Sequence, residues 1–296
     1  MASIGAEIQK WGGFVKFSHT VFALPFAIAS MVVAARETRG WPGWRVFGLI
    51  VIAMVAARTC AMAFNRIADR DFDRANPRTK DRHLPSGRIS LVSAWLLCSL
   101  SGLALIVASY FINTICFYLS PVALFVVCFY SLTKRFTDFT HFYLGVALAL
   151  APLGAWLAVR GSLSLLPVVL ALAVVAWLVG FDIIYALQDY EFDRQQRLHS
   201  LVVRWGADNA LTFAFLSHMV MWGLLAFFGL VCGFRMAYIT GLVIILGSLL
   251  LEHWLARRRS LKWINVAFFR LNGLISLVFL AVTTAEVIWP AFRISR

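Results

Sequence analysis

Nine apolar stretches of about twenty residues each follow one another along almost the whole sequence. An α-helix of this length crosses the hydrocarbon core of a bilayer, which is roughly 30 Å thick. The connections between the stretches leave no room for a soluble domain, so residues 1–296 are predicted to form a single all-α transmembrane domain. We expect helices near residues 14–35, 45–64, 91–110, 113–131, 140–158, 164–187, 209–232, 236–255 and 271–290.

The composition also indicates a chain that is surrounded by lipid. Hydrophobic residues make up 61% of it and charged residues 14%, whereas soluble domains carry roughly 25% charged residues. The net charge of +13 could suggest a nucleic-acid partner. In a chain of apolar helices, however, the position of the charges is more informative. We therefore predict contact with membrane lipid, no nucleic-acid partner and no obligate protein partner.

The lysines and arginines are concentrated on one side of the predicted spans. The connections after the second, fourth, sixth and eighth spans hold 17 of them, and the other four connections hold five. Loops rich in lysine and arginine stay in the cytoplasm. The distribution therefore predicts a cytoplasmic N-terminus and a C-terminus on the outer side.

An acidic motif occurs twice, each time at the cytoplasmic end of an even-numbered span. The second span leads into Asn65-Arg-Ile-Ala-Asp69-Arg-Asp-Phe-Asp73-Arg, and the sixth leads into Asp189-Tyr-Glu-Phe-Asp193-Arg. The two copies of Asp-x-acid-Phe-Asp-Arg are 120 positions apart. This repetition is typical of an internal duplication.

The spacing within each motif places its oxygen atoms on one helix face. Residues four apart share a face, so Asn65, Asp69 and Asp73 form one ladder, and Asp189 and Asp193 form a second. Mg²⁺ prefers oxygen ligands and commonly joins one or two carboxylates to substrate phosphates. We therefore predict that all five residues bind Mg²⁺ and that the four aspartates are catalytic, holding a diphosphate. One such motif alone could be a solvated helix end, but the repetition favours the metal site.

The acid in the middle of each motif, Asp71 or Glu191, lies two residues from its neighbours and thus off the ladder. We expect these two acids to pair with loop arginines and not to bind the metal.

Four further polar residues fall inside predicted spans. Arg58 and Asp182 each lie seven residues before an acidic ladder, and an intramembrane charge needs a cavity or a partner. Both are candidates for the substrate site; alternatively, they form an ion pair that holds two helices together. Lys16 and His19 are candidates for lining the acceptor pocket, although Lys16 could instead extend its ammonium group to the interface.

The fourth span ends in Tyr130-Ser131-Leu-Thr-Lys134-Arg135, which places hydroxyl groups and two cations at the cytoplasmic face. The cations alone could simply be positive charges on the cytoplasmic side. Beside the acidic motifs, the segment indicates phosphate binding.

These motifs together resemble the UbiA superfamily of intramembrane prenyltransferases. The resemblance covers the chain from the first span to about residue 206. Within the superfamily, three segments look like the 4-hydroxybenzoate polyprenyltransferase group, which includes a branch assigned to menaquinone made through futalosine. They are Lys16-Phe-Ser-His-Thr-Val-Phe-Ala-Leu-Pro25, Asn76-Pro-Arg-Thr-Lys-Asp-Arg-His-Leu-Pro-Ser-Gly87 and Leu198-His-Ser-Leu.

The resemblance implies nine helices around a central cavity that is capped by the loops after the second and sixth helices. It implies that the four aspartates hold Mg²⁺-diphosphate with help from Asn65, and that Tyr130 and Ser131 lie beside the reacting carbons. It also implies a bacterial cell membrane and an active site at the cytoplasmic face. The phosphate charge would be neutralised by Arg78, Lys134 and Arg135.

The implied reaction transfers a polyprenyl group from its diphosphate to a ring carbon of an aromatic hydroxy acid. We favour 4-hydroxybenzoate as the acceptor; a dihydroxynaphthoate, for menaquinone synthesis, is the alternative. A function of another class is a secondary transporter, because repeats and intramembrane charges also occur in transporters. A transporter site is expected near the membrane midplane, however, whereas these carboxylates lie at one face.

Overall fold

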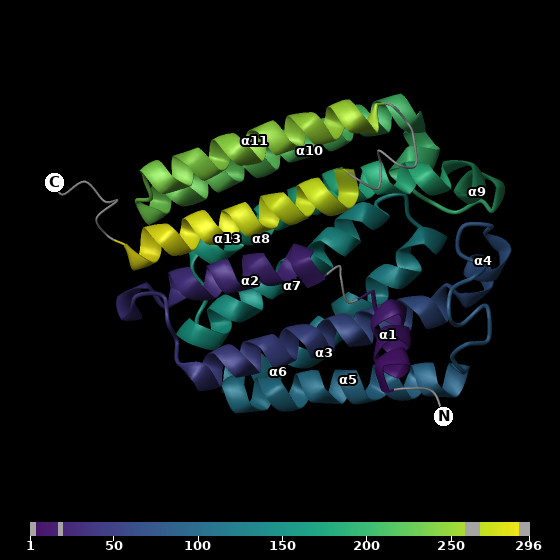
Figure 1. Cartoon of the computed structure of the whole chain (residues 1–296), viewed down its shortest axis with the longest axis horizontal. Helices are drawn as coiled ribbons and strands as arrows, with labels where there is room; N and C mark the ends of the chain where they lie inside the picture. The colour runs from purple at the N-terminus through teal and green to yellow at the C-terminus, as the bar shows by residue number, and fades with distance from the viewer. Residues whose placement is uncertain (1–3, 17–19, 258–266, 290–296) are drawn as a thin grey trace. The chain divides into compact units, whose positions relative to one another are not determined.

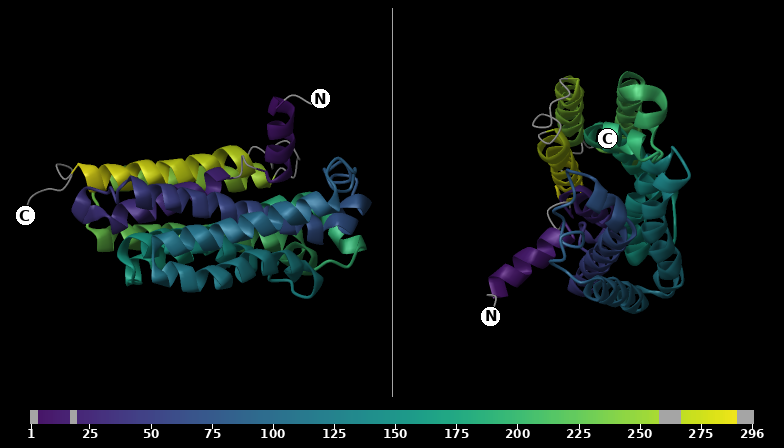
Figure 2. Two further views of the ribbon diagram at one scale, coloured as in Figure 1. Left: turned by 90° about the horizontal axis from the view of Figure 1, so that it is seen from below. Right: turned by 90° about the vertical axis from the view of Figure 1, so that its right-hand side faces the viewer.

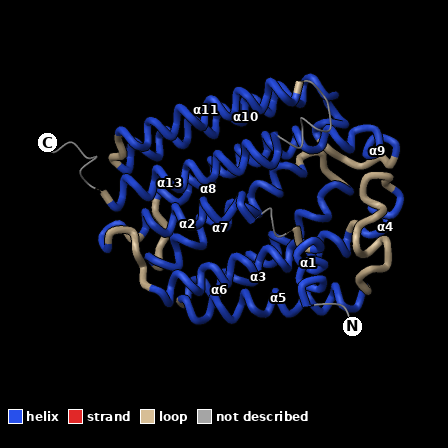
Figure 3. Tube along the Cα trace, viewed as in Figure 1, coloured by secondary structure: helices blue, strands red, loops and turns tan. Residues whose placement is uncertain are grey.

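The computed structural model describes residues 4–16, 20–257 and 267–289, and the regular elements of these residues are all helices (Figures 1 and 3). Short 3-10 or π turns, η2 (Arg36–Thr38), η3 (Tyr130–Arg135), η4 (Leu187–Asp189) and η5 (Ala267–Leu271), link some of them. The α-helices are α1 (Ile4–Phe14), α2 (Thr20–Ala34), α3 (Trp44–Ala68), α4 (Arg70–Ala75), α5 (Leu91–Ile112), α6 (Thr114–Phe129), α7 (Thr140–Arg160), α8 (Leu165–Ala186), α9 (Tyr190–Gln195), α10 (Leu201–Cys232), α11 (Met236–Ala256) and α13 (Asn272–Ile288).

Eight helices of the described chain are long and apolar enough to cross a membrane. They match the second to ninth predicted spans, so the all-α transmembrane fold is confirmed. The seventh span begins earlier than predicted, because α10 starts at Leu201 and breaks at Gly206. Gly206 has φ 76° and ψ 164°, a conformation that glycine adopts readily because it lacks a Cβ atom.

The first predicted span differs from the single helix expected over 14–35. An 11-residue helix, α1, ends at Phe14, and Lys16 follows it in the left-handed region with φ 52°. The described part of the apolar run then forms α2, a helix of 15 residues. A side chain with a Cβ atom stops a right-handed helix when it adopts positive φ, so α1 and α2 are separate elements.

The chain divides into two compact units. The first comprises residues 1–20 and 48–132, and its core joins the end of α1 to α3 and α5. Phe14, Cys60, Ala63 and Cys98 are buried together there. The Arg66 Nε atom lies 3.5 Å from the Phe14 carbonyl oxygen, which ties the end of α1 to α3.

The second unit comprises residues 21–47 and 133–296 and is built around α8. Residues 165–195 include α8, and 67% of the residues in their most apolar 18-residue stretch are buried. This share is larger than in any other candidate span of the described chain. The ring centroids of Trp177 on α8 and Phe26 on α2 are 4.9 Å apart, with the rings tilted by 43°, and α10 packs along α8. Figure 2 shows α11 and α13 running side by side in this unit.

Close packing on α8 depends on a glycine. A Cβ atom at Gly180 would overlap the imidazole ring of His218 on α10. Small residues commonly allow transmembrane helices to approach each other closely. Gly180 thus sets the separation of α8 and α10.

Candidate functional site

The first acidic motif lies in the first unit, where α3 gives way to the six-residue helix α4. Asp69 stands between them with φ −91° and ψ 6°. The hydrogen bond from Asp69 N to Asn65 O is 2.9 Å long, and that from Asp73 N to Asp69 O is 2.8 Å long. The Asn65 side chain also donates to Asp69 Oδ2 at 2.9 Å. The four-residue spacing of the predicted ladder is therefore kept across the helix break.

The second motif, in the second unit, repeats this backbone geometry. η4 ends at Asp189, which has φ −105° and ψ 4°, and the six-residue helix α9 follows. Asp189 and Asp193 are 9% and 3% exposed. The Lys134 ammonium lies 3.7 Å from Asp193 Oδ2, and the Lys134 carbonyl accepts a hydrogen bond from the amide of His199. The sequence repeat is thus a repeat of structure: a helix ends at an aspartate and a short helix follows.

Asp73 is buried and is held by arginines that were not among the predicted site residues. The Arg82 guanidinium donates to Asp73 Oδ1 at 2.6 Å, and Arg66 Nη1 lies 3.9 Å from Asp73 Oδ2. Among the described residues, Oδ2 has no hydrogen-bond partner. This oxygen has lone pairs available to a metal ion or a hydrogen-bond donor, whereas the neighbouring guanidinium groups of Arg66 and Arg82 are suited to a phosphate.

The acids in the middle of the motifs lie apart from these contacts. Asp71 and Glu191 are both exposed, and Arg70 donates to Asp71 Oδ1 at 3.2 Å. The predicted arginine partner is therefore present for Asp71, although it is the adjacent residue and not a distant loop residue.

Three more candidates lie near the first motif. Arg58 donates to the Lys16 carbonyl at 3.4 Å. Tyr130 interacts electrostatically with Arg58 and Asp69. Ser131, the next residue, is buried and interacts with the Tyr130 side chain. These contacts gather several of the predicted substrate-binding residues in the first unit.

Lys16 lies among positive charges. Burial, together with the charges of Arg66, Arg82 and Arg78, lowers the pKa of its ammonium group to about 8. The segment that holds Lys16 is therefore strongly cationic, and an anionic group placed near it would favour the charged form of this lysine.

Asp182 has a partner that the sequence did not predict. His141 Nδ1 lies 2.7 Å from Asp182 Oδ2, which joins α7 to α8. His141 is 1% exposed. An intramembrane acid needs a partner, and this histidine supplies it within the second unit, so Asp182 does not depend on Arg58 for one. His141 lies 41 positions before Asp182, and no sequence pattern connects the two residues.

Of the remaining predicted residues, Arg78 lies in the loop after α4 and Arg135 ends η3. Arg78 and Arg135 are exposed, and the Arg78 amide donates to Asn76 Oδ1 at 2.9 Å. His19 lies outside the described residues, so its predicted role in the acceptor pocket stays a prediction.

The donor types fit Mg²⁺, which prefers carboxylate and amide oxygens. Each unit supplies two of the four predicted aspartates, and Asn65 belongs to the first. Within the described part of the chain, no three His, Cys, Asp or Glu side chains are grouped closely enough to hold a metal ion.

Breaking the Arg82–Asp73 pair is expected to loosen the loop after α4. In Arg82→Gln, Asp73 loses a charge-assisted hydrogen bond, which is worth about 1.5–3 kcal/mol. Hydrogen exchange of the amides of Thr79 and Ser86, which are hydrogen-bonded inside this loop, should accelerate roughly 10- to 150-fold. Arg74→Gln, at an exposed position of α4, is the matched control. Equal exchange in the two variants would show that the pair does not hold the loop.

Comparison with known proteins decides the family. The model of the UbiA prenyltransferase family matches residues 23–274. The chain belongs to this family. Its relatives include two 4-hydroxybenzoate octaprenyltransferases. That of Burkholderia vietnamiensis is 32% identical over 246 residues, 82% of this chain and 83% of the relative. That of Francisella tularensis subsp. novicida is 31% identical over 217 residues, 73% and 75% of the two chains.

Solved UbiA structures show the same fold. The apo structure of a UbiA homologue from Aeropyrum pernix is 28% identical, has a TM-score of 0.81, and is matched over 90% of this chain and 98% of that one. A UbiA homologue from Archaeoglobus fulgidus bound to GPP and Mg²⁺ is 22% identical, with a TM-score of 0.71 and coverage of 94% and 99%. The resemblance of the sequence motifs to this family is confirmed, and the chain is an integral membrane prenyltransferase of the UbiA type.

Proposed function

We propose that this UbiA protein transfers a polyprenyl group from polyprenyl diphosphate to a ring carbon of 4-hydroxybenzoate, in quinone biosynthesis. The observation that carries the proposal is the repeated arrangement of Asp69 and Asp189, each at a helix break before a short helix with a buried aspartate. The names of the curated relatives support the acceptor.

The carboxylates would hold the diphosphate indirectly, through Mg²⁺. Asn65, Asp69, Asp73, Asp189 and Asp193 offer oxygen ligands, and homologous structures that contain GPP or DMAPP also contain Mg²⁺. When bound, the ion would offset the charge that develops on the departing diphosphate. Lys134 lies beside Asp193, so its ammonium group could move from that carboxylate to a phosphate oxygen.

The reaction breaks the bond between the allylic carbon and the diphosphate oxygen, which takes the electron pair. The allylic carbocation that remains is attacked by a ring carbon of the phenol. Loss of the proton from that carbon, to the released diphosphate or to a carboxylate of the site, restores aromaticity. The protein has to keep water away from the cation, and apolar transmembrane helices provide such surroundings.

The acceptor carboxylate requires a cationic partner. Lys16 and Arg58, which are joined by the hydrogen bond from the guanidinium to the Lys16 carbonyl, are the candidates in the first unit. A dihydroxynaphthoate also presents a phenol and a carboxylate, so the same pair could serve menaquinone synthesis. The distribution of lysine and arginine supports a cytoplasmic N-terminus, an outer C-terminus and a site at the cytoplasmic face of a bacterial cell membrane.

The test is an assay of the lipid product. Membranes that contain the protein, Mg²⁺ and a labelled allylic diphosphate are incubated with 4-hydroxybenzoate or with 1,4-dihydroxy-2-naphthoate, and the products are identified by mass spectrometry. We expect the prenylated 4-hydroxybenzoate to form at least about tenfold faster, and EDTA to abolish its formation. A faster reaction with the naphthoate would replace the acceptor but keep the chemistry. Failure with both acids, combined with solute flux in proteoliposomes, would favour a transporter.

A further inference from the structure

The second unit contains a buried polar network that the proposed reaction does not use. His218, Glu252 and Asn272 are 0% exposed, and His253 is 7% exposed. These residues come from α10, α11 and α13 and follow no recognisable sequence pattern. Buried ionisable groups inside a membrane protein are costly and commonly mark a function.

The hydrogen bonds of the network define how the two histidines share their protons. His218 Nε2 lies 3.1 Å from the Trp177 carbonyl oxygen, which can only accept, so Nε2 carries a proton. In a neutral ring Nδ1 is then an acceptor, and it lies 2.9 Å from His253 Nε2. His253 Nε2 must therefore donate. For two neutral rings, His253 Nδ1 is left as a hydrogen-bond acceptor.

The rest of the network fixes these rings in place. The Trp177 indole donates to Asn272 Oδ1 at 2.6 Å, and Asn272 Nδ2 donates to Glu252 Oε1 at 2.7 Å. His253 also packs edge to face with Phe215, with ring centroids 5.2 Å apart. The His253 ring is thus held by His218 and Phe215 of α10, and His218 is in turn held by the Trp177 carbonyl of α8.

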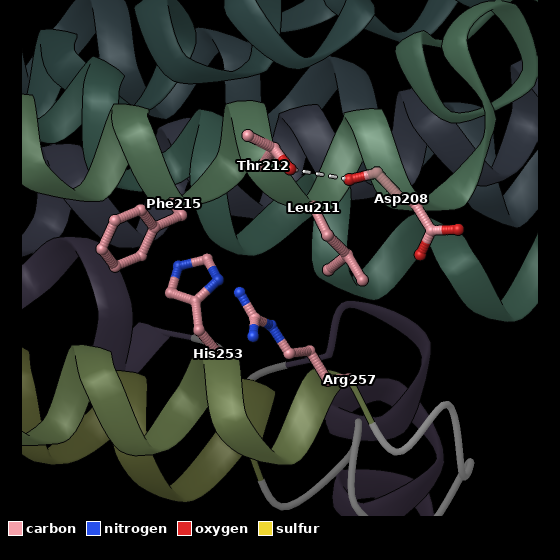
Figure 4. A pocket seen from close by; sticks show the side chains of 6 residues that line it. All are labelled: Asp208, Leu211, Thr212, Phe215, His253 and Arg257. Carbon is pink, nitrogen blue, oxygen red and sulfur yellow. Dashed lines mark hydrogen bonds between the residues drawn. The ribbon is translucent and has the colours of Figure 1, made fainter.

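His253 also lines a cavity of ≈ 390 Å³ between α10 and α11, which we term the α10–α11 pocket (Figure 4). Arg257, one helical turn after His253, extends into the same space, and the two side chains interact electrostatically. The pocket is lined by Asp208, Leu211, Thr212, Phe215, His253 and Arg257.

The Asp208 carboxylate, the acid that lines the pocket, is not directed at the Arg257 guanidinium. In Figure 4 the Asp208 carboxylate points away from both His253 and Arg257. Asp208 follows the break of α10 at Gly206 by two residues, so it lies in the first turn of the helix that restarts there. An acid at that position interacts favourably with the positive end of the helix dipole. The space next to Arg257 thus remains suitable for an anion.

The pocket also lies beside surfaces that are expected to meet lipid. Leu216 on α10 is 55% exposed, and Leu251 and Trp254 on α11 are 44% and 55% exposed. These side chains stand within about two helical turns of the pocket, and Leu211 and Phe215 make its wall apolar. An occupant would therefore have a charged group near Arg257 and an apolar part toward the acyl chains.

We infer that the α10–α11 pocket binds the headgroup of an anionic phospholipid with a free hydroxyl group, as in phosphatidylglycerol. The Arg257 guanidinium binds the phosphodiester, His253 Nδ1 accepts a hydrogen bond from the headgroup hydroxyl, and Phe215 and Leu211 contact the first carbons of the acyl chains. No bond is made or broken, and the inference is independent of the proposed reaction.

The experiment measures lipid binding to the full-length protein in detergent by native mass spectrometry. Phosphatidylglycerol is expected to bind, and Arg257→Gln should weaken its binding at least about tenfold, because it removes a charge-assisted contact worth about 1.5–3 kcal/mol. Arg235→Gln, the same change immediately before the other end of α11, is the matched control and should leave binding unchanged. Equal affinities in the two variants would overturn the site.

Two further ligands test the headgroup hydroxyl and the acyl chains separately. Phosphatidylethanol has the same phosphodiester but no headgroup hydroxyl, and should bind roughly five- to tenfold more weakly; equal binding would overturn the role of His253. Glycerophosphoglycerol has the same phosphodiester and headgroup hydroxyl without acyl chains. If it bound as tightly as the lipid, the occupant would be a soluble phosphate and the lipid assignment would be wrong.

Discussion

Asp69→Asn and Asp189→Asn are each expected to reduce prenyl transfer at least about a thousand-fold, because each removes a negative charge from one half of the proposed diphosphate site. The amide keeps the size of the side chain and part of its hydrogen bonding. The fold should therefore be retained. The measurement is the rate of lipid product formation at saturating Mg²⁺, together with gel filtration in detergent to confirm the folded state.

The chain offers matched controls for both variants. Asp71→Asn and Glu191→Gln make the same change of charge in the same motifs, but at exposed positions off the ladder. They should retain activity within about threefold, since surface charges contribute little. Wild-type activity in both Asp69→Asn and Asp189→Asn would overturn the assignment of these aspartates to the diphosphate.

Gly180→Ala is expected to lower the thermal stability of the protein strongly. The new Cβ atom would overlap the imidazole of His218, and that ring cannot withdraw without losing its hydrogen bonds to the Trp177 carbonyl and to His253. Overpacking costs about 1–3 kcal/mol, and each buried polar group left without a partner costs about 1–3 kcal/mol more. The unfolding midpoint in detergent should fall by roughly 5–15 °C.

The control for this substitution is Gly223→Ala, in α10, where an added Cβ atom meets no atom within 4 Å. Alanine is the better helix former, so this variant should be as stable as the wild type or slightly more stable. Equal midpoints for the two variants would mean that α8 and α10 can separate without cost.

The membrane fold was predictable because each span has to be apolar along its whole length. The same uniformity hides local backbone changes. The turn at Lys16 and the break at Gly206 depend on positive φ values, and hydrophobicity does not report them. The apolar run from Phe14 therefore suggested one helix where the described residues form α1 and α2.

The acidic ladders were predictable for a different reason: the same acidic motif occurs twice in the sequence. The spacing of Asn65, Asp69 and Asp73 survives the break between α3 and α4, because hydrogen bonding with four-residue spacing continues through Asp69. The partners of the acids were not predictable. Arg82 and Arg66 are two of the seven lysines and arginines in the connection after the second predicted span. Nothing in the sequence distinguishes them from the others as partners of Asp73, and only the folded loop selects them. The same holds for His141 beside Asp182.

The short helices α4 and α9 have a consequence for ligand affinity. A six-residue helix is too short to persist by itself. The buried aspartate of each helix already has a cationic partner within the protein: Arg82 for Asp73, and Lys134 for Asp193. At the proposed site, a Mg²⁺ ion would have to compete with the internal cation for the same carboxylate. Its net affinity would then be smaller than the new contacts alone would give.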